Sequence, residues 1–360
     1  MFQKSEKVLA ISMWDISWLE LHERGEAFEN WELRVKELKD RGYDVVRIDP
    51  YIHLLSLPDD RFYLEPVWAD YGWGATKPCN ISHIFEQLVE FMKICQREEI
   101  LVAFSAWYRH YEKNNYVSHI TDGTVWGSMW VTLMDRLKAE NLLASIYYVD
   151  FCNEYPLWAD FLPEDKRHFR RRRDCPEIME WTRACTETFK KSYPDIPTTF
   201  SLCSEFCRMQ REDFSDYDFF EPHIWIDSDG DGRFEDGLKR YMQDAVVSQE
   251  ELFRIKKEFY EEGKEYWDEV LHQQIHFFGN LSRKWNKPLI TTECWAIVFY
   301  LDSPVGWDWI KEICEKGVSF AIEEKRYVAI ATSNFCSPQF KGMWEDLKWH
   351  QKMTEQIHKA

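Results

Sequence analysis

Two glutamates, each directly after a short apolar segment, are the residues of this sequence best placed to do chemistry. Glu154 follows the segment 144–153 and Glu293 follows the segment 288–292. Because runs of β-branched and aromatic residues bounded by proline are typical of strands, each carboxylate is expected at the C-terminal end of a strand. The interval between the two holds about three strand–helix repeats, at roughly 30 or more residues per βαβ unit. We therefore expect the two glutamates to face each other across an active site.

Two carboxyl groups in different protonation states can hydrolyse a glycosidic bond. One delivers a proton to the leaving oxygen, and the other attacks the sugar or activates water. A separation of roughly 5–5.5 Å gives retention of configuration and roughly 6.5–9.5 Å gives inversion, so the sequence leaves both outcomes open. Arg47 lies inside another apolar segment, where an unpaired charge would be costly. Either it faces the surface, or it points inward and is held by the catalytic carboxylates.

The segments that must position these residues alternate with helix-like stretches along the whole chain. Eight strands are predicted, at 8–14, 43–50, 100–108, 144–152, 196–202, 218–225, 288–293 and 327–334. This alternation favours a parallel α/β sheet, and the count of eight favours a closed (β/α)8 TIM barrel with elaborated βα loops. We expect a single catalytic domain over 1–360, with a long aromatic loop at 51–79 and a helical insertion at about 237–262 broken near Gly263. Neither a GxGxxG nor a Walker motif is present, which disfavours a nucleotide-binding doubly wound fold.

Composition limits the function classes. The formal charge of −18 opposes non-specific binding to nucleic acid, and no run of 18 apolar residues would span a membrane. Ten scattered cysteines without a CxxC pair, together with an N-terminus that lacks a secretory signal pattern, predict a cytoplasmic protein. Aromatic residues make up 16% of the chain. Most should be core, but those just after strands could stack on sugar rings. Side chains expected to line the site at strand ends are Trp14, Asp15, Trp107, Tyr108, His223, Trp225, Trp295 and Asn334.

Four of these strand-end features together resemble a known family. Asn153-Glu154 after the fourth strand, Glu293 after the seventh, Arg47 on the second and His223 on the sixth are similar to the site of clan A glycoside hydrolases, the cellulase-like (β/α)8 superfamily. The resemblance implies that Glu154 is the general acid/base and Glu293 the nucleophile, with net retention. It also implies that Asn153 contacts the sugar 2-hydroxyl, that Arg47 supports Glu293, and that His223 lies with Trp225 in the pocket wall.

Two positions depart from the family pattern. Tyr155 stands where many members have proline, and the eighth strand ends in Ser333-Asn334-Phe335, where many members place a tryptophan platform for the reacting sugar. Trp295 or Phe335 could substitute for that platform. These departures bear on the identity of the sugar rather than on the chemistry.

Two further motifs have open interpretations. The segment 227–232 resembles the first half of an EF-hand loop, but Leu238 stands where the bidentate ligand belongs. The segment is therefore an acidic turn, a structural Ca²⁺ site or a rim loop that contacts the sugar. Its candidate ligands are Asp227, Asp229, Asp231 and Glu235. The basic run 167–173 is either a solvated face or a clamp for an oxyanion.

The sequence therefore predicts a retaining glycoside hydrolase that acts on small β-linked glycosides or oligosaccharides, with a carbohydrate as its partner and no required cofactor. One alternative is a catalytically silent, sugar-binding cellulase-like protein. Another is a metal-dependent barrel hydrolase using His110, His223 and aspartates, although no HxH pair stands at a strand end. Oligomeric state, sugar identity and linkage are left open.

Overall fold

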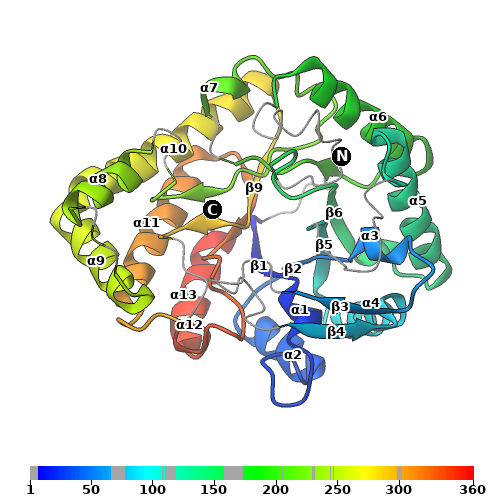
Figure 1. Ribbon diagram of the computed structural model, residues 1–360, viewed down its shortest axis with the longest axis horizontal. Helices are drawn as coiled ribbons and strands as arrows, with labels where there is room; N and C mark the ends of the chain where they lie inside the picture. The colour runs from blue at the N-terminus through cyan, green and yellow to red at the C-terminus, as the bar shows by residue number, and fades with distance from the viewer. Residues whose placement is uncertain are drawn as a thin grey trace.

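Parallel strands form the centre of the molecule, as the computed structural model in Figure 1 shows. The structure describes residues 7–65, 78–107, 109, 119–157, 173–203, 206–228, 232–243, 245, 247–297 and 302–360. One seven-stranded sheet runs in the order β7-β6-β5-β2-β1-β11-β9, and every neighbouring pair in it is parallel. Its strands are β1 (Leu9–Asp15), β2 (Val45–Ile48), β5 (Leu101–Ser105), β6 (Ile146–Asp150), β7 (Thr198–Thr199), β9 (Leu289–Thr291) and β11 (Tyr327–Ala331).

Residues 218–225 close this sheet into a barrel. Phe220 pairs in parallel with Leu289 on one side, and Pro222 pairs with Leu202 on the other. Just beyond, β8 (Ile224–Trp225) pairs with β10 (Cys294–Trp295). The ring therefore returns to the chain beyond β7, and all eight predicted strand segments take part in it. The predicted (β/α)8 barrel is confirmed.

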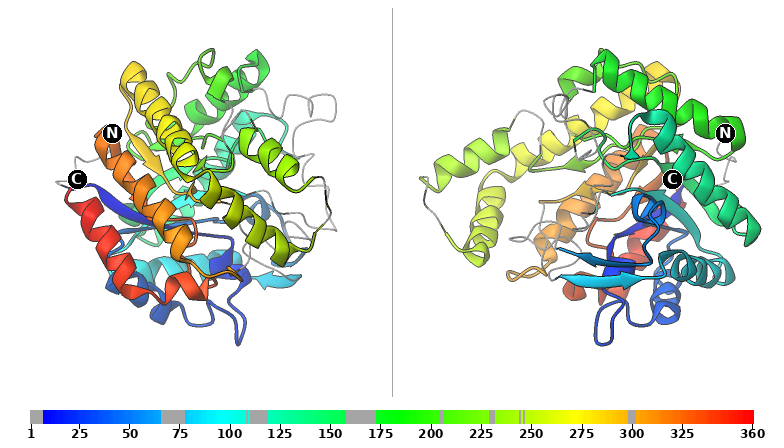
Figure 2. Two further views of the ribbon diagram at one scale, coloured as in Figure 1. Left: turned by 90° about the vertical axis from the view of Figure 1, so that its left-hand side faces the viewer. Right: turned by 45° about the vertical axis from the view of Figure 1, so that its right-hand side comes forward.

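Helices form a layer outside the strands, with their apolar faces buried against the sheet (Figures 1 and 2). Three of them begin at a side-chain cap: Asn30, Asp122 and Asp346 each accept a hydrogen bond from a backbone N–H in the first turn. Such caps satisfy donors that the helix itself leaves unpaired. The long helices of this layer are α2 (Trp31–Asp40), α4 (Ile84–Arg97), α5 (Gly123–Ala139), α6 (Pro176–Ser192), α10 (Lys264–Trp285), α11 (Asp308–Glu324) and α13 (Leu347–His358).

Two elaborations interrupt the regular alternation. α8 (Arg233–Tyr241) and α9 (Gln249–Glu262) project as an arm beside α10, and Gly263 separates α9 from α10 as predicted (Figures 1 and 2). The insertion begins at Arg233, a little before the predicted start. The region predicted as a long loop carries α3 (Ile52–Leu55) and an antiparallel pair, β3 (Arg61–Leu64) with β4 (Cys79–Ser82). Residues 66–77, with most of its tryptophans and tyrosines, lie outside the described residues.

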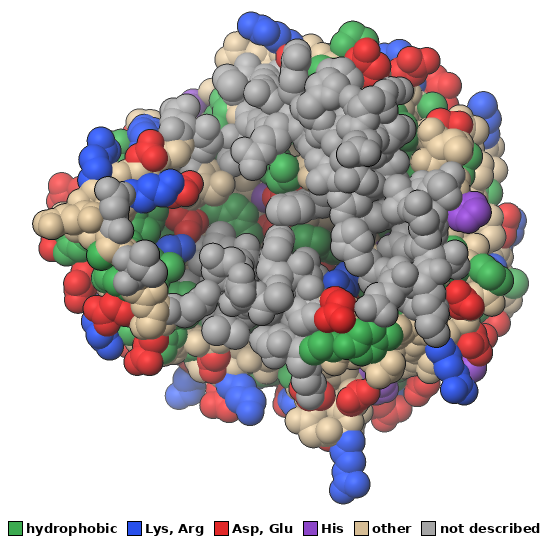
Figure 3. All heavy atoms as spheres, in the orientation of Figure 1, with side chains coloured by type: hydrophobic (Ala, Val, Ile, Leu, Met, Phe, Trp, Pro, Cys, Tyr) green, Lys and Arg blue, Asp and Glu red, His purple; other side chains and the backbone are tan. Residues whose placement is uncertain are grey.

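The remaining short elements are α1 (Ser17–Glu20), the 3₁₀ helix η2 (Leu143–Ser145), α7 (Phe206–Met209) and α12 (Lys341–Trp344). Acidic and basic side chains are mixed along the α8–α9 arm, as Figure 3 shows, with ion pairs between Lys239 and Glu235 and between Lys257 and Glu261. Among the described helices, none combines the length and the apolar character needed to cross a bilayer.

Candidate active site

Arg47 is the centre of a buried polar network at the C-terminal ends of the strands. Its side chain, on β2, is completely buried and points inward. Its Nε and Nη2 donate to the two oxygens of Asp15 at 2.9 and 3.0 Å. Nη1 donates to Oε1 of Glu221 at 2.9 Å, and Nη2 donates to Oε1 of Glu293 at 2.7 Å. Because a buried guanidinium needs anionic partners to offset its desolvation, these contacts explain why an arginine is tolerated inside a strand.

The same guanidinium also contacts uncharged groups. Nη2 donates to Oδ1 of Asn153 at 2.8 Å, and Nη1 donates to the hydroxyl of Thr292 at 2.5 Å. Thr292 in turn donates to Oε1 of Glu221 at 2.6 Å. A guanidinium carries five N–H groups, so every donor of Arg47 is engaged and some are shared. One side chain thus ties β2 to the turn after β6, to the segment 218–225 and to the residues that follow β9.

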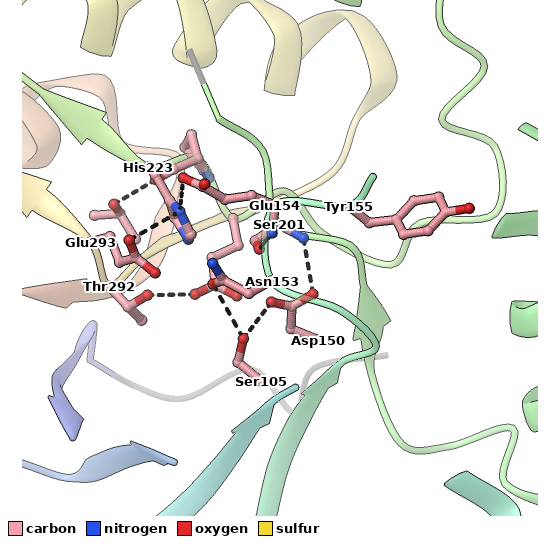
Figure 4. A network of polar contacts seen from close by, with 12 residues as sticks. Ser105, Asp150, Asn153, Glu154, Tyr155, Ser201, His223, Thr292 and Glu293 are labelled. Atoms are coloured by element: carbon pink, nitrogen blue, oxygen red, sulfur yellow. Dashed lines mark hydrogen bonds and ion pairs between the residues drawn. The ribbon is translucent and has the colours of Figure 1, made fainter. Parts of the chain in front are cut away.

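Glu154 owes its position to a sharp turn after β6. Its φ is 47°, in the left-handed region that non-glycine residues rarely adopt. Its backbone N–H donates to Oγ of Ser201 at 2.8 Å, which ties the turn to the chain just beyond β7 (Figure 4). Oγ of Ser105 and the backbone N–H of Ser201 both donate to the carboxylate of Asp150 just upstream. The strained turn is therefore held by neighbours on both sides.

His223 connects the two candidate catalytic carboxylates. Its Nδ1 lies 2.8 Å from Oε1 of Glu154 and 3.4 Å from Oε2 of Glu293 (Figure 4). Its Nε2 lies 3.3 Å from Nη1 of Arg47. Since arginine can only donate, Nε2 is the acceptor and Nδ1 carries the proton that is donated to Glu154. Burial lowers the pKa of His223 to about 4, so the ring is neutral at pH 7.

The two glutamates that the sequence analysis singled out lie close together. A carboxylate oxygen of Glu154, one of Glu293 and a ring nitrogen of His223 are all within 4.8 Å of one another. Burial raises the pKa of Glu293 to about 7, while His223 and Arg47 act in the opposite direction. Burial likewise raises the pKa of Glu221 to about 7, against the effect of Arg47. Because both carboxyls contact one guanidinium, their ionisations are linked.

Three predicted binding residues lie in or beside this centre. The Nδ2 of Asn153 is buried and has no hydrogen-bond partner among the described residues, so it is a donor open to a ligand. The indole N–H of Trp107 donates to Oδ2 of Asp15 at 2.9 Å. Trp225 lies on β8 two residues beyond His223, and its carbonyl accepts a hydrogen bond from Gln274.

Two aromatic residues expected at the site, Trp14 and Trp295, point away from it into the core. The ring of Trp14 packs edge-on against Phe28, Phe91 and Trp344. The ring of Trp295 packs against Gly317 of α11, so closely that a Cβ there would lie 2.4 Å from it. Both rings are core, which supports neither Trp295 as a sugar platform nor Trp14 as a residue that lines the site. The reason is that successive positions of a strand point to opposite faces, so an aromatic at a strand end can face the helices instead of the barrel.

The remaining predicted residues are either buried in the core or outside the described part of the chain. Phe335, the second candidate platform, is buried against Trp307 and Phe340. Tyr108 and His110 lie outside the described residues, as do residues 167–172 of the basic run.

Arg173 ends the basic run, and it is neither solvated nor free for a ligand. It is buried, its Nε lies 3.1 Å from both carboxylate oxygens of Glu212, and its Nη1 donates to the carbonyls of Tyr155 and Ser201. It thus ties the residue after Glu154 to Ser201, whose Oγ accepts from the backbone N–H of Glu154.

Three contributors were missed by the sequence analysis as site residues: Glu221, Thr292 and Arg173. A usable signal existed for the first two. Glu221 stands two positions before His223 on one strand and Thr292 adjoins Glu293, so the period of two would place Glu221 on the same face as His223. No local pattern marks Arg173, because its partners are distant in sequence.

The candidate calcium loop is only partly described. Asp227 forms an ion pair with Lys256 at 3.3 Å, and Glu235 pairs with Lys239 at 2.9 Å. Asp229 and Asp231 lie outside the described residues. Ca²⁺ binding there stays a prediction.

A (β/α)8 barrel with glutamates at the ends of its fourth and seventh strands defines the class: the fold of clan A glycoside hydrolases. The chain belongs to the Cellulase-like family, described as sugar-binding cellulase-like proteins, whose model matches residues 11–358. A Parabacteroides distasonis protein solved as a candidate glycoside hydrolase is 32% identical, with a TM-score of 0.90 over 98% of this chain and 94% of that one.

More distant structures share the fold alone. An endo-1,4-β-D-mannanase from Thermotoga petrophila has a TM-score of 0.53 at 10% identity, over 90% of this chain and 87% of that one. A family 5 mannosidase from Rhizomucor miehei has a TM-score of 0.52 at 9% identity, over 98% and 94%. A search of curated proteins found no match.

Proposed function

We propose that this protein is a retaining glycoside hydrolase that acts on small β-linked glycosides or oligosaccharides, with Glu293 as nucleophile and Glu154 as general acid/base. The observation that carries the proposal is the approach of the two carboxylates to within 4.8 Å. That spacing is of the order expected for retention, about 5–5.5 Å, and is shorter than the roughly 6.5–9.5 Å of inverting enzymes.

The surroundings of each carboxylate support its role. Glu293 accepts from Arg47, which favours the ionised form needed for attack on the sugar carbon. Glu154 accepts from the neutral imidazole of His223, which orients it without adding a formal charge. In the first step Glu293 displaces the leaving group while Glu154 protonates the departing oxygen. In the second step Glu154 takes a proton from water, which attacks the glycosyl ester and frees Glu293.

Asn153 has a matching role in this proposal. Its Oδ1 is held by Arg47, so its free Nδ2 is fixed beside Glu293. An amide donor at that place suits the hydroxyl next to the reacting carbon, where hydrogen bonds strengthen in the transition state.

The test is turnover of a panel of activated aryl glycosides, with the first-formed anomer identified by ¹H NMR. We expect at least one β-glycoside to be cleaved with the product first appearing as the β-anomer. An α-anomer as first product from a β-glycoside would mean inversion and would overturn the assignment of Glu293 as nucleophile.

A sugar-binding protein without turnover is the second candidate, favoured by the family's own description as sugar-binding. Titration with the free sugars, followed by tryptophan fluorescence, discriminates between the two. Saturable binding with no product from any aryl glycoside would favour this second candidate.

A further inference from the structure

Glu221 is a buried carboxyl that the proposed mechanism does not use. It stands in the segment 218–225, and its side chain is completely buried. Its Oε1 accepts from Nη1 of Arg47 at 2.9 Å and from the hydroxyl of Thr292 at 2.6 Å. Its Oε2 has no hydrogen-bond partner among the described residues. One oxygen of this carboxyl is therefore satisfied, and the other is left without a donor.

The buried network around Arg47 holds more acidic groups than basic ones. Asp15, Glu221 and Glu293 all pair with this one guanidinium, and their side chains are at most 5% exposed. In the described part of the chain, the one further basic group in contact with them is His223, beside Glu293, and its ring is neutral at pH 7. Because an uncompensated buried charge is costly, the network is more stable when one carboxyl keeps its proton.

The hydrogen bonds indicate which carboxyl this is. Both oxygens of Asp15 accept from Arg47. Oε1 of Glu293 also accepts from Arg47, and its Oε2 lies 3.4 Å from Nδ1 of His223. Among the oxygens of the three carboxyls, Oε2 of Glu221 is the buried one without a described donor. A proton on this atom turns an unpaired acceptor into a donor.

An acceptor for that proton lies on β6. The hydroxyl of Tyr148 is likewise buried and has no partner among the described residues. Its ring packs edge-on against Phe219, with the ring centroids 4.9 Å apart. Phe219 stands two positions before Glu221 and so on the same face of its segment. Burial raises the pKa of Tyr148, and the Glu221 carboxyl beside it raises this pKa further. The two unpaired groups therefore face each other.

The other groups around Glu221 come from three parts of the barrel. Burial raises the pKa of Glu221 to about 7, and the negative charge of Asp150 on β6 acts in the same direction. Arg47 on β2 and the hydroxyl of Thr292 after β9 act in the opposite direction. His223, on the same segment as Glu221, adds no formal charge at pH 7. The neutral form of Glu221 is thus favoured by its surroundings as well as by its unpaired oxygen.

We propose that Glu221 is a positioning residue that keeps its proton in the free protein, donates it in a hydrogen bond to Tyr148, and leaves the charge of Arg47 to Asp15 and Glu293. A neutral Glu221 still accepts from Arg47 through Oε1, so it holds the guanidinium in place without competing for its charge. The assignment of the proton stands on the network itself. Its consequence for Glu293 as nucleophile rests on the proposed function.

Infrared spectroscopy of the whole protein tests the proton directly. Near pH 7 ordinary carboxyls are ionised, so the carbonyl band of a protonated carboxylic acid reports only carboxyls whose pKa is raised. The spectrum of wild type minus that of Glu221→Gln should contain one such band. The control is Glu355→Gln, at an exposed ion pair on α13, for which the difference should contain none. Absence of the band from the Glu221→Gln difference would mean an ionised Glu221 and would overturn the proposal.

Tyr148→Phe tests the direction of the contact, and it leaves Glu221 unchanged, so it also serves if Glu221→Gln does not fold. If Glu221 donates, its acid band should remain in Tyr148→Phe and move to higher wavenumber, because the acid has lost its acceptor. If the phenol instead donates to an ionised Glu221, the difference between wild type and Tyr148→Phe contains no acid band. That result would overturn the proposal.

The consequence for the nucleophile is read from the midpoint of the acidic limb of kcat/KM against pH. If Glu221 is already neutral, Glu221→Gln changes no charge and the midpoint should stay at the wild-type pH. Asp15 is among the groups that raise the pKa of Glu293, so Asp15→Asn should move the midpoint about one unit lower. An equal downward shift in Glu221→Gln would overturn the proposal. If no aryl glycoside is cleaved, the proposed function fails, while the infrared spectra still decide where the proton lies.

Discussion

Nη2 of Arg47 lies 2.7 Å from Oε1 of Glu293. Arg47 lies on β2, and Glu293 follows β9 on the other side of the barrel mouth. The same guanidinium holds Asp15 and Glu221. Glu293 is thus fixed by a cation whose own position is fixed by two further carboxylates. This arrangement immobilises Glu293, and the contact with Arg47 favours its ionised form against the burial that raises its pKa to about 7.

Two substitutions of Arg47 distinguish the contribution of its positive charge from that of its hydrogen-bonding geometry. Arg47→Lys keeps the positive charge but loses the fork that contacts several partners at once, so we expect a folded protein whose kcat/KM falls about 100-fold. Arg47→Met leaves buried carboxylates without a cation and should cost about 3–5 kcal/mol of unfolding free energy. Kinetics and denaturant unfolding check the two variants. The control is Arg97→Lys, at an exposed ion pair, and equal behaviour of Arg47→Lys and this control would contradict the account.

The acidic limb of the pH–rate profile should report Glu293. Burial raises its pKa to about 7, and the carboxylate must be ionised to attack, so kcat/KM should fall as the pH drops below about 7. Glu154 is among the groups that raise the pKa of Glu293. Glu154→Gln removes that repulsion, so its acidic limb, measured with an activated aryl glycoside that needs no acid, should move to lower pH. An acidic limb that stays at the same pH, or moves to higher pH, in Glu154→Gln would contradict the assignment of this limb to Glu293.

Arg173 should act on catalysis through the position of Glu154. It donates to the carbonyls of Tyr155 and Ser201 and pairs with Glu212 in a buried site. Arg173→Lys should lower kcat about tenfold or more with little change in KM, because the acid is displaced while sugar contacts remain. Kinetics on substrates with good and poor leaving groups check this: the loss should be larger for the poor leaving group. Arg183→Lys, at a partly exposed ion pair, is the control. An equal loss for both leaving groups would point to general destabilisation instead.

Metal removal should leave activity unchanged. Glu154, His223 and Glu293 are close enough to hold an ion, but the guanidinium of Arg47 already supplies positive charge at Glu293. Dialysis against EDTA followed by assay is the measurement. Activity that disappears and returns with Zn²⁺ would revive the metal-dependent alternative.

The close approach of Gly317 to Trp295 gives a stability test of the core. A Cβ at Gly317 would lie 2.4 Å from the ring, so Gly317→Ala should destabilise the protein by about 1–3 kcal/mol through overpacking. Since the ring is core, KM should be unchanged. An increase in KM without loss of stability would show that Trp295 contacts the sugar after all.

The barrel could be predicted because each of its strands is a distinct apolar run separated by a helical stretch. The residues that meet at Arg47 were predictable for a related reason: carboxyl ends of parallel strands converge at one edge, so strand-end polar residues meet there. The segment 218–225 was the least regular strand, since it enters the ring through isolated bridges at Phe220 and Pro222 and through the two-residue pair of β8 with β10.

What could not be predicted was the direction of side chains near irregular strand ends. Trp14 and Trp295 stand where a stacking residue would stand, yet both face the helices. Arg173 looked like part of a solvated basic run, and its burial depends on Glu212 and Tyr217, far along the chain. Contacts of this kind are set by tertiary packing, which local sequence does not encode.

The central claim, that Glu293 is a nucleophile in a retaining mechanism, is tested most directly by azide rescue. Glu293→Ala should be inactive on the best aryl glycoside, and azide should restore turnover by entering the vacated face, giving a glycosyl azide of anomeric configuration opposite to the normal product. Glu154→Ala with azide should instead give an azide of the same configuration as the normal product, formed from the glycosyl-enzyme. Activity retained in Glu293→Ala, or azide products of one configuration from both variants, would contradict the account.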